Sequence, residues 1–156
     1  MSVTEKFAAL AGEWTGTNRL NMSWLPDPVK ESSSTAVVQQ RLNGQCLEIA
    51  YTWEFDGEHH QGFLILNGDP KSDAATAVWS DSWHSANVLM YCSGRLENEG
   101  RVVLIGHYKV ADHPDWGWRT EIETTAEGFT YRMFNISPEG DEEWAVETDF
   151  TRAGAD

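Results

Sequence analysis

The stretch Gly12-Glu13-Trp14-Thr15-Gly16 stands where a short apolar leader gives way to the first of a row of alternating segments. Gly12 is the expected end of a helix, because glycine accepts the left-handed backbone of a C-cap. Trp14 is then a bulky side chain at the start of the first strand, and its ring needs a packing partner. Arg152, at the end of the last alternating segment, would supply one if the first and last strands pair. Such a cation–aromatic contact is worth about 0.5–2 kcal/mol.

The leader before Gly12 predicts a short helix over residues 4–11. Phe7, Leu10 and Ala11 share a face at helical spacing, and the Thr4 hydroxyl can cap the first turn. We expect the apolar face of this helix to cover one end of a barrel.

Short strands are predicted along the chain from residue 13 to residue 152. Residues 45–55 give the clearest signal, because apolar and polar side chains alternate there with a period of two. The other strands are expected at 13–24, 33–42, 75–84, 87–96, 101–110, 116–125 and 129–136, with one around 63–66 and a last one after 137–141. Frequent turn signals without a crossover helix are typical of an antiparallel sandwich or an up-and-down barrel. We predict an all-β fold in one domain over residues 1–156: an antiparallel up-and-down barrel of about ten strands with a short N-terminal helix.

Three short motifs carry a resemblance to a known family. They are the leader with Gly12-Glu13-Trp14, the stretch Trp79-Ser80-Asp81-Ser82, and the closing Glu147-Thr148-Asp149-Phe150-Thr151-Arg152. With these motifs the sequence resembles the uncharacterised bacterial DUF1579 family over nearly the whole chain. More broadly, Gly-x-Trp at the first strand and an Arg closing the last strand resemble the calycin superfamily of lipocalin-like barrels. That superfamily includes nitrobindin-like and fatty-acid-binding-protein-like members, and the resemblance implies the same type of barrel.

The charge balance is strongly acidic, with 25 Asp and Glu against 11 Lys and Arg and a formal charge of −14. Such a chain repels phosphate backbones and anionic lipid, so nucleic acid and membrane surfaces are poor partners. The acidic residues are spread along the chain, which favours a solubilising exterior over a dedicated acidic site. The start of the chain lacks a signal-peptide pattern, and no apolar run approaches the ~18 residues of a membrane span. We therefore expect a cytoplasmic protein.

No segment reaches the standard of a catalytic motif, so no catalytic residue is assigned. Ser80, Asp81 and His84 lie close together, but adjacent strand positions point to opposite faces and no Gly-x-Ser-x-Gly elbow is present. No metal is expected, because no pair of His or Cys has ligand spacing. Cys46 and Cys92 lie in apolar alternating runs, so we expect buried thiols, and a disulfide is not indicated.

The resemblance raises a haem site, because nitrobindins open with a similar Gly-x-Trp-x-Gly and bind haem through a histidine late in the chain. This sequence has no histidine after His113, and it has Asn18 where those proteins continue with a third glycine. We therefore expect no haem, and no other cofactor is indicated.

A barrel of about ten strands is wider than the eight-stranded size that side chains just fill, so an internal cavity is expected. The residues predicted to bind a ligand there come from four consecutive strands, which are neighbours in a meander. They are Trp79, Trp83, Tyr91, His107 and Arg119. Indoles provide apolar area and an arginine fork binds a carboxylate, so the expected ligand is a small, partly apolar molecule that can carry a carboxylate. The prediction requires that strand register turn these side chains inward.

Two other functions fit the sequence. One is a small enzyme, an isomerase or a hydrolase, with His84 or His107 as the acid-base group of the same cavity. The other is a structural or dimerising protein with a packed interior, because eight tryptophans and four tyrosines can fill a barrel as well as line a cavity. A ligand-sized cavity would argue against the packed interior, and a buried histidine paired to a carboxylate beside it would favour the enzyme. A homodimer is compatible with the sequence.

Overall fold

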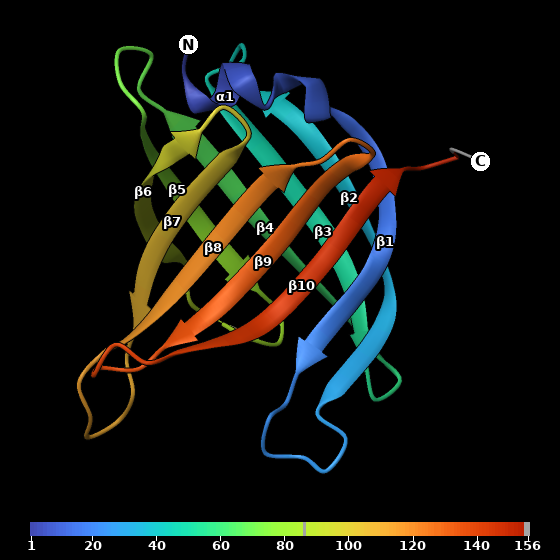
Figure 1. Cartoon of the computed structure of the whole chain (residues 1–156), viewed down its shortest axis with the longest axis vertical. Coiled ribbons are helices and arrows are strands. Elements are labelled where there is room, and N and C mark those ends of the chain that lie inside the picture. Colours follow the sequence, from blue (N-terminus) through green and yellow to red (C-terminus); the bar gives the residue numbers. More distant parts are fainter. Residues whose placement is uncertain (86, 155–156) are drawn as a thin grey trace.

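The computed structural model describes residues 1–85 and 87–154, and it is a closed barrel of ten antiparallel strands (Figure 1). The strands are β1 (Gly12–Asn21), β2 (Val29–Arg41), β3 (Cys46–Phe55), β4 (Glu58–Gly68), β5 (Ala74–Asp81), β6 (Met90–Asn98), β7 (Arg101–Tyr108), β8 (Trp116–Thr124), β9 (Gly128–Ile136) and β10 (Glu142–Arg152). Each strand pairs with its neighbours in sequence, and β1 also pairs with β10, which closes the sheet. The predicted all-β, up-and-down barrel is confirmed.

Inner-facing apolar side chains from all ten strands form one core. Trp14 on β1 is buried in it and meets Phe129 on β9 edge to face, with ring centroids 5.1 Å apart. Cys46 and Cys92 are buried free thiols, as expected.

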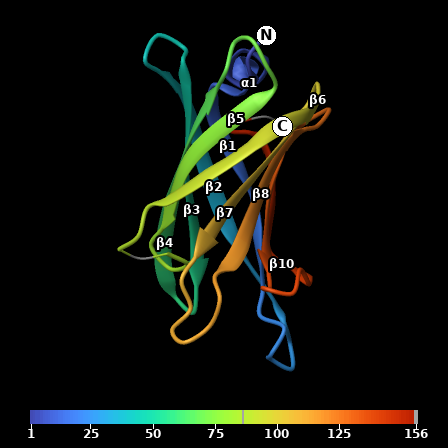
Figure 2. The same cartoon turned by 90° about the vertical axis from the view of Figure 1, so that its left-hand side faces the viewer.

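The helix at the start of the chain is shorter than predicted. Helix α1 spans Val3–Lys6 and a 3-10 turn, η1, spans Ala8–Leu10. Ser2, rather than Thr4, is the N-cap: its Oγ accepts from the Glu5 amide at 3.3 Å, and the Glu5 carboxylate accepts from the Ser2 amide at 2.6 Å. In this reciprocal capping box, Ser2 is the N-cap and Glu5, three residues later, is its partner, so Thr4 lies inside the helix. As expected, the leader lies across one end of the barrel (Figures 1 and 2), and Val3 and Phe7 are buried.

Strand ends differ from the prediction most at the opposite end of the barrel. β1 stops at Asn21, before the predicted residue 24, and β5 stops at Asp81, before residue 84. β5 ends early because the Asp81 carboxylate accepts the backbone N–H groups of Trp83 and His84, which folds the chain into a turn. Trp83 and His84 therefore do not follow the alternation of the strand.

Candidate functional site

A pocket of about 650 Å³ lies at the end of the barrel opposite α1. It is formed by the end of β5, the turn that follows, the end of β7 and the starts of β6 and β8. Figure 2 shows these β5–β6 and β7–β8 connections at the end away from the helix. The lining residues are Trp79, Trp83, His84, Ser85, Val88, Met90, His107, Tyr108, Lys109 and Trp118.

The imidazole of His84 lies among four indole rings. It stacks on Trp53, with ring centroids 5.4 Å apart and an angle of 24° between the ring planes. The centroid of the His84 ring lies 5.3 Å from that of Trp118 and 4.8 Å from that of Trp83. The ring of Trp79 has its centroid 6.3 Å from that of His84 and stacks on the ring of Trp118. We call these five residues the ring cluster. Its flat faces give the pocket a largely aromatic wall.

The carboxylate of Asp81 accepts hydrogen bonds from three residues of the ring cluster, which are Trp53, Trp83 and His84. This carboxylate is almost fully buried, with 2% of the residue exposed. Oδ2 accepts from the Tyr51 hydroxyl at 2.8 Å and from Trp53 Nε1 at 3.2 Å, and Oδ1 accepts the two amides of the turn. Four donors make a buried carboxylate tolerable without a cation, because each hydrogen bond to the charged form offsets lost hydration. Asp81 therefore couples β3, β5 and the turn that carries His84.

Burial keeps two titratable side chains of this region, His84 and Tyr51, uncharged at neutral pH. It lowers the pKa of His84 to about 4, against the opposing effect of the Asp81 charge and with a further lowering by His60. Burial also raises the pKa of Tyr51 well above its ordinary value, and the nearby Tyr131 and Asp81 add to this effect. At neutral pH the imidazole and the phenol are therefore both neutral, and the charge near the cluster is that of Asp81.

The His84 ring has no carboxylate partner in the part of the chain that the structure describes. Among residues 1–85 and 87–154, neither of its ring nitrogens has a hydrogen-bond partner, since Asp81 binds the backbone amide of His84 rather than its ring. The orienting contact that a histidine acid-base group receives from a carboxylate in a triad is thus not formed by the described residues.

The structure brings together three of the five residues that the sequence predicted to bind a ligand. Trp79 lies deep in the pocket, Trp83 lies at its edge, and His107 is exposed at its mouth. Tyr91 lies on the outer wall of β6, opposite Val78, and is 66% exposed. Arg119 lies on the outer wall of β8, opposite the partly exposed Ile105. The expected convergence of all five residues is wrong, because Trp118 and Thr120 are the inward residues of β8 and alternation places Arg119 between them on the other face.

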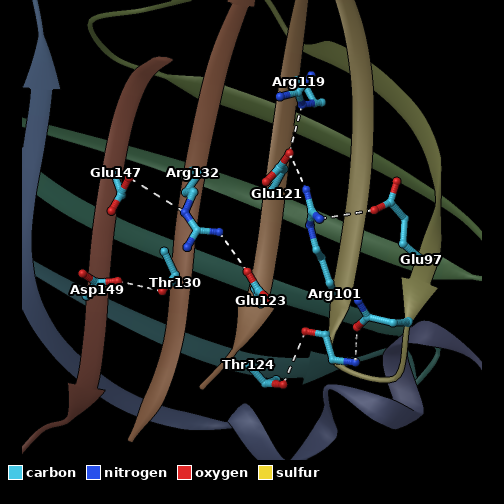
Figure 3. A network of polar contacts seen from close by, with 12 residues as sticks. Glu97, Arg101, Arg119, Glu121, Glu123, Thr124, Thr130, Arg132, Glu147 and Asp149 are labelled. Atoms are coloured by element: carbon cyan, nitrogen blue, oxygen red, sulfur yellow. Dashed lines mark hydrogen bonds and ion pairs between the residues drawn. The ribbon is translucent and has the colours of Figure 1, made fainter. Parts of the chain in front are cut away.

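Arg119 instead belongs to a ladder of charged residues on the outer wall (Figure 3). Its guanidinium binds Glu121 at 3.0 Å and also binds Glu142, and it lies over the Phe134 ring at 4.3 Å. Glu121 has only 5% of its side chain exposed, since Arg101 covers it from the other side at 2.9 Å. With Nε and Nη1 bound to carboxylates and its plane over Phe134, Arg119 is a structural cation of the wall.

Sequence reasoning left Trp118 and Tyr51 out of the binding site and named His84 only as the acid-base group of the enzyme alternative. Tyr51 and Trp118 were within reach, because each shares the inward face in a strand that alternates cleanly. His84 was not, because its position depends on the turn that Asp81 closes.

No group of three or more His, Cys, Asp or Glu side chains that could hold a metal ion occurs in the described part of the chain. Nor does any helix within those residues have the length and apolar character to cross a membrane.

Fold and site together define a small closed β-barrel with an aromatic pocket at the end away from its helix. Residues 3–152 match the family described as "Protein of unknown function (DUF1579)", and the chain belongs to this family. No curated protein matches the sequence.

Proposed function

We propose that the protein is a non-enzymatic barrel that binds a small, partly apolar molecule in the pocket beside the ring cluster. The observation that carries this proposal is the pocket of about 650 Å³ with indole and imidazole rings in its wall. Ligand sites of roughly 300–1,000 Å³ with aromatic linings and few polar groups are the usual size and composition for small molecules. A pocket of this kind also argues against an interior packed to both ends.

The polar end of the ligand has partners at the mouth of the pocket. Lys109 and His107 both line it, and Lys109 forms an exposed ion pair with Asp115 at 3.1 Å. An exposed pair of this kind contributes little to stability, so Lys109 is available to a ligand carboxylate at small cost. In this proposal Lys109 takes the anchoring role that the sequence suggested for Arg119.

Two further features support this assignment. The closed barrel with Trp14 on its first strand and Arg152 on its last is consistent with the resemblance to lipocalin-like calycins, which hold ligands in their barrels. Free thiols at Cys46 and Cys92 fit a reducing compartment such as the cytoplasm. The enzyme alternative has less support, because no described residue gives the His84 ring the carboxylate partner that would orient it as an acid-base group.

The test has two stages. Native mass spectrometry of freshly purified protein should reveal a retained small molecule, and titration with fatty acids and aromatic acids should quench tryptophan emission to saturation. Trp83→Ala should weaken that binding severalfold, because Trp83 forms part of the pocket wall and is only partly buried. Trp24→Ala is the matched control, since Trp24 is 70% exposed and lies outside the pocket. If no compound shifts emission or melting temperature, or if both variants weaken binding equally, the proposal fails.

A further inference from the structure

The buried indoles of the ring cluster differ in whether their N–H groups are used. Trp53 Nε1 donates to Asp81 at 3.2 Å, and Trp79 Nε1 donates to the Tyr51 hydroxyl at 2.9 Å. Trp118 Nε1 is shielded from solvent, yet it has no acceptor within residues 1–85 and 87–154. Thr120, the next inward residue of β8, also has a buried hydroxyl without a partner among them. Buried donors are nearly always paired, so the unpaired N–H on the pocket-lining Trp118 calls for a partner that a ligand acceptor could supply.

Charge restricts what that acceptor can be. The buried Asp81 carboxylate, which is hydrogen-bonded to residues of the ring cluster, already has four donors, whereas Lys109 lies at the mouth with 90% of its side chain exposed. An anion at the inner end would lose its hydration and face Asp81 without a cation beside it. The inner end of the ligand must therefore be uncharged.

The shape of the pocket wall further restricts the part of the ligand that reaches the inner end. Trp79 and Trp118 stack with planes at 16° and centroids 5.3 Å apart, so this wall of the pocket is flat. The two rings packed on Trp118 are those of Trp79 and His84. Trp79 is held in β5 and hydrogen-bonded, whereas His84 belongs to a turn and its ring has no described hydrogen bond. Of these two rings, His84 is the one that can move away from Trp118. The flat, neutral ring of an entering ligand would then take the place of the flat, neutral imidazole.

We infer that the pocket selects a flat aromatic molecule whose inner end is an uncharged hydrogen-bond acceptor, such as a carbonyl, bound by the Trp118 indole N–H. Any anionic group of the ligand then stays at the mouth, near Lys109. This inference rests on the proposed function and specifies its ligand class.

Two matched pairs of naphthalene probes test the inference at neutral pH, with tryptophan emission as the readout. 2-Acetylnaphthalene should bind about two- to tenfold more tightly than 2-ethylnaphthalene, the range expected for one net hydrogen bond. 6-Acetyl-2-naphthoate should bind with its carboxylate at the mouth. Naphthalene-2,6-dicarboxylate should bind about tenfold more weakly than that probe, because one carboxylate must face inward.

Variants locate the preference. Trp118→Phe keeps an aromatic ring but removes the N–H, so it should abolish the preference for the acetyl probe over 2-ethylnaphthalene. Trp24→Phe, outside the pocket, should leave the preference intact, and His84→Ala should tighten both neutral probes by opening the ring cluster. In the unmodified protein, the proton resonance of the Trp118 indole N–H should move downfield with the acetyl probe only, which gives a readout even if a variant fails to fold.

The outcomes separate the two proposals. If none of the naphthalenes binds, the proposed function itself fails. If they bind but show no acetyl preference, or if the preference survives Trp118→Phe with an unmoved indole resonance, this inference is overturned and the pocket is a general apolar site.

Discussion

The guanidinium of Arg152 lies over the indole of Trp14, with its Cζ 4.1 Å from the ring centroid. The two residues are direct partners in the β1–β10 pairing that closes the barrel. Arg152 also donates to the carbonyl oxygens of Ala11 and Ala9, both at 2.8 Å. One side chain therefore joins the last strand, the first strand and the 3-10 turn, and the contact predicted from sequence is confirmed.

Gly12 ends the helical leader as expected, and it has a second role. It follows η1 and the residue Ala11, and its φ of +137° is open to glycine but strained for other residues. A Cβ at this position would lie 2.3 Å from Arg152 Nη1. Gly12 therefore provides the space through which the guanidinium reaches the leader.

Arg152→Lys should destabilise the protein by about 1–2 kcal/mol, because a lysine keeps the charge but cannot combine the stacking contact with two carbonyl bonds. Urea denaturation provides the measurement. Arg41→Lys is the control, since Arg41 forms only an exposed ion pair with Glu48 and such pairs are worth little. Equal unfolding midpoints for the two variants would contradict the structural role of Arg152.

Asp81→Asn should cost about 2–4 kcal/mol, because an amide donor would face either the donors on Oδ2 or those on Oδ1 and leave them unpaired. The loss should appear as a lower urea midpoint together with weaker near-ultraviolet circular dichroism from the tryptophans. Asp56→Asn is a suitable comparison, as Asp56 is at a turn with φ of 50°, a conformation that asparagine also tolerates. A wild-type midpoint for Asp81→Asn would show that the buried carboxylate is not needed.

Acidification should destabilise the protein through His84. In the unfolded chain this histidine takes up a proton near its ordinary pKa of 6.5, whereas in the folded protein burial lowers the pKa to about 4. The stability contributed by neutral His84 is thus fully present above pH 6.5 and is lost as the pH falls towards 4. Urea midpoints measured between pH 7.5 and 4.5 should fall less steeply in His84→Phe, while His113→Gln should match the wild type. An NMR titration that finds the folded His84 pKa near 6.5 would refute this account.

Arg119→Ala should leave ligand affinity unchanged and lower the free energy of unfolding by about 1–2 kcal/mol, since it removes charge-assisted contacts to Glu121 and Glu142 from the outer wall. Trp83→Ala should show the reverse balance, with reduced affinity and a smaller effect on stability. Binding titrations and urea curves for both variants provide the comparison. Loss of affinity in Arg119→Ala alone would restore the cation to the binding site.

The barrel was predictable because its strands alternate over lengths of about ten residues, and turn residues such as Asn43-Gly44 and Asp56-Gly57 separate them. The partner of Trp14 was predictable for a similar reason, since a closed meander leaves its first and last strands to pair. Ser2 was missed as the helix cap because Thr4 offers the same hydroxyl chemistry two residues later. In that case the sequence alone did not choose between two equivalent signals.

The composition of the site was harder to predict because it depends on which face each strand turns inward. A shift of one residue in register exchanges the inner and outer faces of a strand. Trp118 and Arg119 are neighbours in β8, so Trp118 lines the pocket and Arg119 lies on the outer wall. Propensity does not decide where β5 ends, either. The Asp81 carboxylate does so by accepting the backbone N–H groups of Trp83 and His84. Tyr51 and Trp53, which come from a strand far away in the sequence, hold that carboxylate in place.

The pairing of β1 with β10 also bears on how the protein is made. While the nascent chain leaves the ribosome, β1 can pair with β2 early, but its other side stays unpaired until the residues up to Arg152 have been synthesised. That side is an open row of amide and carbonyl groups, of the kind that recruits foreign strands. Ring closure between the first and last strands is also a contact of very long range, which slows folding. The newborn chain is therefore most prone to pair with foreign strands in the interval before its final strand emerges.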